Sequence, residues 1–242
     1  MKPEVARQLG ELNRRFYASL ADPFARSRAH PQVGFLALLP FLPQQCGTVL
    51  DVGCGNGRFG HFLQQHHPFD RYVGVDFTVE LLAKGAEMLP NATFLPRDMS
   101  RADCLDGLGA FDLVVCLAAM HHVPGRENRV ALLQGMRRVL QPGGRIMLSN
   151  WQFMESERQQ RKVRDWAEVG LTAADVDGTD YLLTWRQDGF GLRYVAMIDE
   201  AETAVMAAAA DLQVIGQFRS DGKEGNLSLY TILMATTSAD AT

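Results

Sequence analysis

The sequence lacks several features that would place it in a special class of protein. It has four cysteines in 242 residues and no C-x-x-C pair, so nothing indicates a zinc site or a disulfide framework. No apolar run approaches the roughly 20 residues that a membrane span needs. The charged first 15 residues also lack the apolar segment of a signal peptide. We therefore expect a soluble, cytoplasmic protein with no metal site.

An excess of positive charge is also absent. The 24 Lys and Arg residues face 28 Asp and Glu residues, a net charge of −4, so composition makes no global electrostatic case for binding nucleic acid. Apolar residues make up 47% of the chain, which suffices for a sizeable core. The length fits a single α/β domain with an insertion, and no internal repeat indicates a second domain.

The segment from Val49 to Gly60, VLDVGCGNGRFG, is the most informative part of the chain. Apolar residues and an acid lead into three glycines spaced two apart. This pattern predicts a buried parallel strand, a tight turn and a helix from about Arg58 to His66. Glycine suits the turn because the backbone there takes dihedral angles that a Cβ would block. The free N–H groups of the helix would face a ligand in the turn, which predicts a loop for a nucleotide-type cofactor.

Two cofactors compete for this loop. Residues 55–60 satisfy the dinucleotide pattern G-x-G-x-x-G, and Asp76 follows at about the distance of a ribose-binding acid. However, Asp51 and Gly53 precede that pattern, so the turn begins one step earlier than in a dinucleotide fold. The segment resembles motif I of the class I S-adenosylmethionine (AdoMet) methyltransferases, whose glycines accommodate the amino-acid end of the cofactor. A glycine turn without a ligand is the remaining alternative.

Further cofactor contacts are expected at the ends of the next strands. Asp76 ends the predicted strand 72–76, where a carboxylate can accept from both ribose hydroxyls, or it caps the following helix. Asp98 follows the strand 93–96, where methyltransferases commonly use an Asp to accept from the adenine amino group; the alternative is an Asp that caps a turn. The predicted cofactor-binding residues are Asp51, Gly53, Gly55, Asn56, Gly57, Asp76, Phe77, Asp98, Met99 and Leu117.

The order of elements predicts the fold class. Strands are expected at 48–51, 72–76, 93–96, 111–116 and 145–150, with helices at 58–66, 79–88 and 127–140 between them, an alternation that favours a parallel sheet. Segments 212–218 and 227–235 read as a terminal hairpin joined by a polar turn. We therefore predict an α/β, Rossmann-like, seven-stranded and mostly parallel sheet with a C-terminal antiparallel hairpin, the class I methyltransferase fold.

The flanks are predicted to complete a single domain, 1–242. Residues 1–45 form an N-terminal helical cap, and residues 236–242 are expected to be disordered. Residues 151–197 are an inserted substrate or lid segment, with a polar helix over 151–168 and a helix start at Thr172; a surface decoration is the alternative.

A second resemblance concerns the methyl acceptor. Segments across the chain resemble the family that methylates the carboxymethyl group on the tRNA wobble uridine. They are Asn13–Tyr17, Phe24–Arg28, Ala119–His122, Asn150–Trp151, Gly178–Trp185, Arg193–Tyr194 and Gly225–Asn226. The resemblance implies tRNA as acceptor, and a small zinc-binding activator protein, used by the eukaryotic members, as a candidate partner. The net charge instead favours a small carboxylate or hydroxyl metabolite. A non-catalytic AdoMet-binding scaffold is a third alternative.

The acceptor chemistry selects the candidate catalytic residues. A carboxylate is already ionised at pH 7 and needs no general base, and an arginine would orient it through two hydrogen bonds, with Arg28 and Arg193 as candidates. A hydroxyl would need a base, for which His121 is the candidate. Asp180 is expected to join them above the carboxyl ends of the strands. The alternative is that Asp180 and Arg193 pair with each other on the surface.

Overall fold

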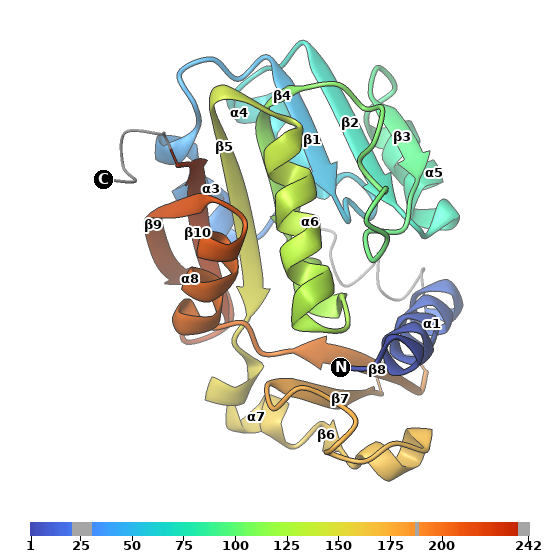
Figure 1. Ribbon diagram of the computed structural model, residues 1–242. Coiled ribbons are helices and arrows are strands. Elements are labelled where there is room, and N and C mark those ends of the chain that lie inside the picture. The colour runs from blue at the N-terminus through green and yellow to red at the C-terminus, as the bar shows by residue number, and fades with distance from the viewer. Residues whose placement is uncertain (21–30, 187–188, 237–242) are drawn as a thin grey trace.

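The computed structural model describes residues 1–20, 31–186 and 189–236. Its main sheet has seven strands in the spatial order β3-β2-β1-β4-β5-β10-β9 (Figure 1). The parallel strands are β1 (Thr48–Val52), β2 (Arg71–Asp76), β3 (Thr93–Pro96), β4 (Phe111–Leu117) and β5 (Leu140–Trp151). β10 (Ser228–Ala235) runs antiparallel to β5 and to β9 (Leu212–Ser220). The predicted fold class is confirmed.

Helices cover both faces of this sheet. α3 (Val33–Leu38) and α4 (Arg58–His66) lie on one face, and α6 (Arg126–Arg138) and α8 (Glu200–Ala209) lie on the other (Figure 1). Side chains of β4 alternate between the two layers: Leu113 and Val115 pack with the α3 and α4 cluster, whereas Val114 and Cys116 pack with the α6 and α8 cluster. A strand buried on both faces must be apolar throughout, which is why β4 reads as a continuous hydrophobic run. α5 (Val79–Met88) connects β2 to β3.

The inserted segment forms a second, three-stranded antiparallel sheet. Its strands are β6 (Val163–Arg164), β7 (Asp180–Trp185) and β8 (Gly191–Ala196). The predicted helix over 151–168 is therefore wrong, since that stretch contains the end of β5, the short α7 (Glu157–Gln160), the 3-10 turns η3 (Phe153–Glu155) and η4 (Trp166–Val169), and β6. A polar stretch without an apolar stripe at helical spacing has no face to bury, so a long helix gains nothing from packing there.

No helix begins at Thr172 either. Its backbone N–H and hydroxyl both donate to the Asp175 carboxylate, which closes a turn. Local bonds of this kind compete with helix formation, and here they prevail.

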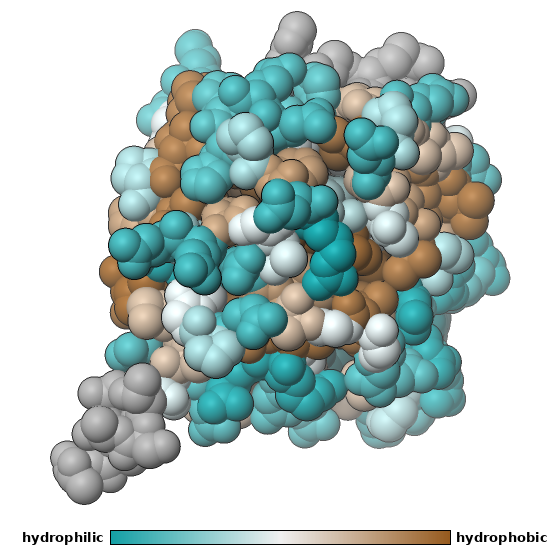
Figure 2. Space-filling view, turned by 90° about the horizontal axis from the view of Figure 1, so that it is seen from above, coloured by the Kyte–Doolittle hydropathy of each residue, from teal (hydrophilic) through white to brown (hydrophobic). Residues whose placement is uncertain are grey.

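The first helix, α1 (Pro3–Ser19), packs on the inserted sheet. The buried Asn13 amide donates to the backbone oxygens of His122 and Tyr194, and its oxygen accepts from the Tyr194 N–H. α1 and β8 therefore lie side by side across the carboxyl ends of the main sheet (Figure 1). Figure 2 views the opposite end, where hydrophilic and hydrophobic side chains are mixed. None of the described helices is both long and apolar enough to cross a membrane.

Candidate active site

The glycine turn between β1 and α4 has a backbone that favours glycine. Gly53, Gly55 and Gly57 have φ angles of 72°, 55° and 71°. A Cβ at Gly53 would lie 2.5 Å from the Cβ of Ala119, so the turn packs too tightly against the segment after β4 to admit a side chain at Gly53. The Gly53 N–H donates to the Val75 carbonyl at 2.8 Å, which ties the turn to β2.

Two adjoining chambers of about 60 Å³ each lie over this turn and share Gly53, Gly55, Leu81 and Ala118. The Asp51 chamber is further lined by Asp51, Asn56, Arg58 and Leu117. The Asp76 chamber is further lined by Asp76, Phe77, Met99, Tyr17 and His122. All of the predicted cofactor-binding residues except Gly57 and Asp98 therefore line one chamber or the other.

The Asp76 carboxylate is positioned by backbone amides. One oxygen accepts from the Thr78 N–H at 2.8 Å and the other from the Gly55 N–H at 2.9 Å. Burial raises the pKa of this carboxyl, and the hydrogen bonds from the backbone N–H groups of Thr78 and Gly55 oppose the rise. The acid thus stands at the carboxyl end of β2, held to the glycine turn, in a position that suits a pair of ribose hydroxyls.

Asp51 lies deeper in the site and is 3% exposed. Its carboxylate accepts a 2.6 Å hydrogen bond from the Tyr72 hydroxyl. Burial raises the pKa of Asp51 to about 7, against the lowering effect of that hydrogen bond. A cationic group in the Asp51 chamber would therefore stabilise the ionised form of this acid.

Asp98 has other partners in this structure. One oxygen accepts from the backbone N–H and hydroxyl of Ser100, and the other accepts from Arg14 at 2.6 Å. The carboxylate therefore closes a turn and ties the loop after β3 to α1. Binding of adenine by Asp98 stays a prediction.

The two histidines after β4 occupy different environments. His122 Nε2 lies 2.7 Å from the Tyr17 hydroxyl, and its Nδ1 lies 3.1 Å from the Tyr194 carbonyl oxygen. Because a carbonyl only accepts, Nδ1 carries the proton and a neutral ring accepts from Tyr17. His121 is 1% exposed, stacks on Trp151 with ring centroids 6.1 Å apart, and has Nδ1 3.4 Å from the Asn150 side-chain oxygen.

Arg193 is the most unusual of the predicted catalytic residues. It is 1% exposed, and its Nε and Nη1 atoms have no hydrogen-bond partner within the described part of the chain. The guanidinium carbon lies 4.7 Å from the ring centre of Trp151, 5.2 Å from that of Phe16 and 5.6 Å from that of Trp185. We call these three rings the aromatic cage. Cation–π contacts offset part of the cost of burial, but they leave the Nε and Nη1 donors without a hydrogen bond.

Asp180 does not pair with Arg193, so the alternative of a surface ion pair between them is excluded. Both residues are buried. The Asp180 carboxylate instead accepts from the Tyr194 hydroxyl at 2.6 Å and lies 3.8 Å from Nη1 of Arg129. On a β-strand, neighbouring side chains point to opposite faces, so Tyr194 reaches Asp180 while Arg193 faces the cage. The fourth predicted catalytic residue, Arg28, lies outside the described residues.

These features fit a nucleoside cofactor with an amino-acid tail. The glycine turn allows close approach, Asp76 stands ready for ribose hydroxyls, and Phe77 and Met99 line the chamber beyond it. The fold and site are those of an AdoMet-dependent methyltransferase domain. Binding of the ribose by Asp76 and of the amino-acid end beside Asp51 stay predictions.

Comparisons with known proteins agree with this conclusion. A family model described as a methyltransferase domain matches residues 50–146. The chain is 30% identical over 166 residues to a tRNA (carboxymethyluridine(34)-5-O)-methyltransferase of Macaca fascicularis, covering 66% of this chain and 22% of the relative. It is 34% identical over 126 residues to a trans-aconitate 2-methyltransferase of Streptomyces avermitilis, covering 50% and 45%.

A solved structure of an S-adenosylmethionine-dependent methyltransferase from Clostridium acetobutylicum has the same fold, with a TM-score of 0.66 at 13% identity over 93% of this chain and 99% of that one. The chain spans less than half the length of either curated relative named above. It contains a class I AdoMet-dependent methyltransferase domain, and AdoMet is the cofactor of this class.

Sequence reasoning missed several residues of the site. Tyr17 and the three cage rings were not predicted as site residues, although all four lie in segments that carry the family resemblance. Arg58 was also missed, although it stands inside the glycine motif, directly beside the predicted cofactor loop.

Proposed function

We propose that this protein transfers the methyl group of AdoMet to a carboxylate oxygen of its acceptor, with Arg193 binding that carboxylate. The observation that carries the proposal is the guanidinium of Arg193, which is 1% exposed and has Nε and Nη1 without a partner in the described chain. Burial of a cation without an anionic partner is costly, so such a group points to a ligand that supplies the partner. A carboxylate is an anion that accepts charge-assisted hydrogen bonds from a guanidinium.

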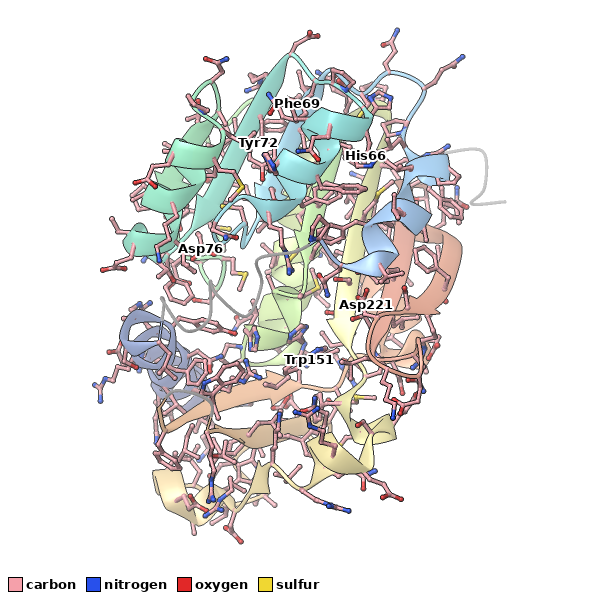
Figure 3. The ribbon with its side chains drawn as sticks, turned by 180° about the vertical axis from the view of Figure 1, so that it is seen from behind. His66, Phe69, Tyr72, Asp76, Trp151 and Asp221 are labelled. Carbon is pink, nitrogen blue, oxygen red and sulfur yellow. The ribbon has the colours of Figure 1, made fainter. Side chains whose placement is uncertain are left out.

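The position of the cage relative to the cofactor supports this role. Phe16 of the cage packs edge-on against Tyr17, which lines the Asp76 chamber, with ring centroids 5.1 Å apart. On the other side, Trp151 stacks on His121, whose ring lies 4.4 Å from that of His122 in the same chamber. Figure 3 shows Trp151 and Asp76 at the same edge of the main sheet. The cage around Arg193 thus adjoins the Asp76 chamber through Phe16 and Tyr17 on one side and through Trp151 and the two histidines on the other.

The chemistry asks little of the protein beyond alignment. The carboxylate oxygen attacks the methyl carbon in line with the bond to sulfur; the new O–C bond forms as the C–S bond breaks, and the electron pair stays on sulfur. No proton moves, so the reaction needs no general base. An anion and a sulfonium lose charge together, and a site walled by aromatic rings excludes the water that would stabilise the separated charges.

Two acceptors are candidates, and the relatives' names support both. Carboxymethyluridine in tRNA and trans-aconitate each carry a carboxylate. The resemblance of the chain's flanks favours the tRNA wobble uridine as acceptor. The net charge of −4 instead favours a small carboxylate metabolite, since a polyanion gains no general attraction from this chain.

The test is transfer of labelled methyl from AdoMet to total tRNA and, separately, to a set of small carboxylic acids. We expect Arg193→Met to lose at least tenfold in rate, about 1.4 kcal/mol in barrier. Its affinity for S-adenosylhomocysteine (SAH) should stay unchanged. Its melting temperature should be unchanged or raised, because the substitution removes a buried cation without a hydrogen-bonded anion.

Arg158→Met, which removes an exposed arginine of the inserted segment, is the matched control. Full activity in Arg193→Met would discard the carboxylate site. Label in tRNA alone supports the wobble uridine, and label in the small acids alone supports a metabolite. Transfer that rises with pH and appears only with hydroxyl acceptors would instead favour a general-base role for His121.

A further inference from the structure

The Asp51 chamber is lined by one positively charged side chain, which has no part in the proposed binding of the acceptor. Arg58 is the one lysine or arginine among the described residues that line this chamber. It is the first residue of α4, directly after Gly57 of the glycine turn. Its side chain therefore lies beside the helix N-terminus, where the backbone N–H groups also favour an anion.

A chain of hydrogen bonds holds the Arg58 guanidinium in place. Its Nη2 donates to the Gln32 side-chain oxygen at 3.0 Å, and the Gln32 amide donates to Asp221 at 3.1 Å. The same Asp221 oxygen accepts from the Tyr230 hydroxyl at 2.7 Å, and the other oxygen accepts from the Gly34 N–H at 3.0 Å. Figure 3 shows Asp221 at the edge of the sheet that also holds Asp76 and Trp151.

The face of the guanidinium is held as well. Its central carbon lies 5.4 Å from the ring centre of Phe35, which also lines the chamber. Burial lowers the pKa of Arg58, although an arginine stays protonated in any folded protein. The Arg58 guanidinium is thus charged, held in one orientation and partly removed from water.

The charges of the chamber match those of an amino acid. Asp51 supplies one acid and Arg58 one cation. The amino-acid end of AdoMet carries one ammonium and one carboxylate, so each finds an opposite charge if the ammonium faces Asp51 and the carboxylate faces Arg58. The reverse orientation places like charges together, which is unfavourable.

We propose that Arg58 binds the carboxylate of the cofactor's amino-acid end, and that Gln32 and Asp221 position its guanidinium for this contact. Arg58 is then a specificity residue that separates AdoMet and SAH from nucleosides that lack the carboxylate. The proposal concerns the cofactor and is independent of the acceptor that Arg193 binds.

Calorimetry with two ligands tests the proposal without any acceptor. The ligands are SAH and decarboxylated SAH, which keeps the ammonium but lacks the carboxylate. We expect the wild-type protein to bind SAH at least tenfold more tightly than the decarboxylated form. Arg58→Met should lose that difference. Its affinity for SAH should fall at least tenfold, while its affinity for the decarboxylated ligand should change by less than about threefold. Gln32→Ala should reduce the difference by less than Arg58→Met does.

Arg71→Met is the matched control, because Arg71 bonds the carbonyls of Leu108 and Ala110 away from both chambers and should leave both affinities unchanged. Equal weakening of both ligands in Arg58→Met would assign the residue a purely structural link between α4 and the β9–β10 hairpin. Equal affinity of the wild-type protein for both ligands would overturn the proposal. It would not contradict the assignment of AdoMet as the cofactor. Neither result bears on the acceptor, which is tested by methyl transfer in Arg193→Met.

Discussion

The Tyr194 hydroxyl donates a 2.6 Å hydrogen bond to the Asp180 carboxylate, and both groups are buried between the inserted sheet and the main domain. The same hydroxyl accepts from Nη1 of Arg129 on α6 at 2.9 Å. Asp180 therefore anchors β7 to β8 and to α6, and it contributes to the site by fixing the strand that carries Arg193. We therefore expect Asp180 to position other residues of the site.

We predict that Tyr194→Phe lowers the free energy of unfolding by about 1–3 kcal/mol, because Asp180 and Arg129 each lose a buried partner. Urea titration measures the change, and Tyr181→Phe on the neighbouring strand is the control. The rate of methyl transfer should fall. The KM for the acceptor should change by a larger factor than the affinity for SAH. An unfolding free energy equal to that of the wild type would show that the bond is not an anchor.

The pKa of Asp51 predicts a pH dependence of stability with a definite sign. Burial raises this pKa to about 7, against about 4 in the unfolded chain. Between these values the folded state binds more protons than the unfolded state, so the Asp51 contribution to stability falls as the pH rises from about 4 to about 7.

Asp51→Asn removes this titration. Its unfolding free energy, measured by urea titration across the same pH window without ligand, should therefore decline less than that of the wild type. Asp106→Asn, which changes an exposed acid, controls for the loss of one charge. A difference between wild type and Asp51→Asn that stays constant from pH 4 to pH 7 would contradict the raised pKa.

The position of Asp76 predicts a large loss of cofactor affinity when it is removed. Asp76→Ala should weaken SAH binding by about 1.5–3 kcal/mol, the scale of hydrogen bonds to a charged group. The wild-type protein should bind SAH and AdoMet but not NAD. Calorimetric titrations with the three ligands measure this. Retained SAH affinity in Asp76→Ala, or tight binding of NAD, would reverse the cofactor assignment.

Asp98 can be separated from its ion pair with Arg14 by comparing two variants. Arg14 and Asp98 side chains are 46% and 22% exposed, so the pair itself should contribute no more than about 1 kcal/mol to stability. If Asp98 also accepts from the adenine amino group, Asp98→Ala weakens SAH binding severalfold and Arg14→Ala does not. A lowered melting temperature with unchanged SAH affinity in Asp98→Ala would show that Asp98 closes its turn and does not contact the cofactor.

The sequence by itself determined the main sheet and many of the residues that line the two chambers, because both depend on local rules. A strand buried on both faces needs a continuous apolar run, as in Phe111–Cys116, and the left-handed turn needs Gly53, Gly55 and Gly57. Residues such as Asp51 and Asp76 then follow from their place at strand ends. Parallel strands place those ends at one edge, so sequence position predicts spatial position.

Only the tertiary structure decided the acceptor side. The inserted segment has no helical or alternating pattern strong enough to reveal β6, β7 and β8, and its fold depends on packing against α1. The partner of Asp180 proved to be Tyr194 and not Arg193, a choice set by which face of β8 each side chain occupies. The aromatic cage joins Phe16, Trp151 and Trp185 from three distant segments. Contacts between distant segments depend on how whole elements pack, and no short stretch of sequence encodes them.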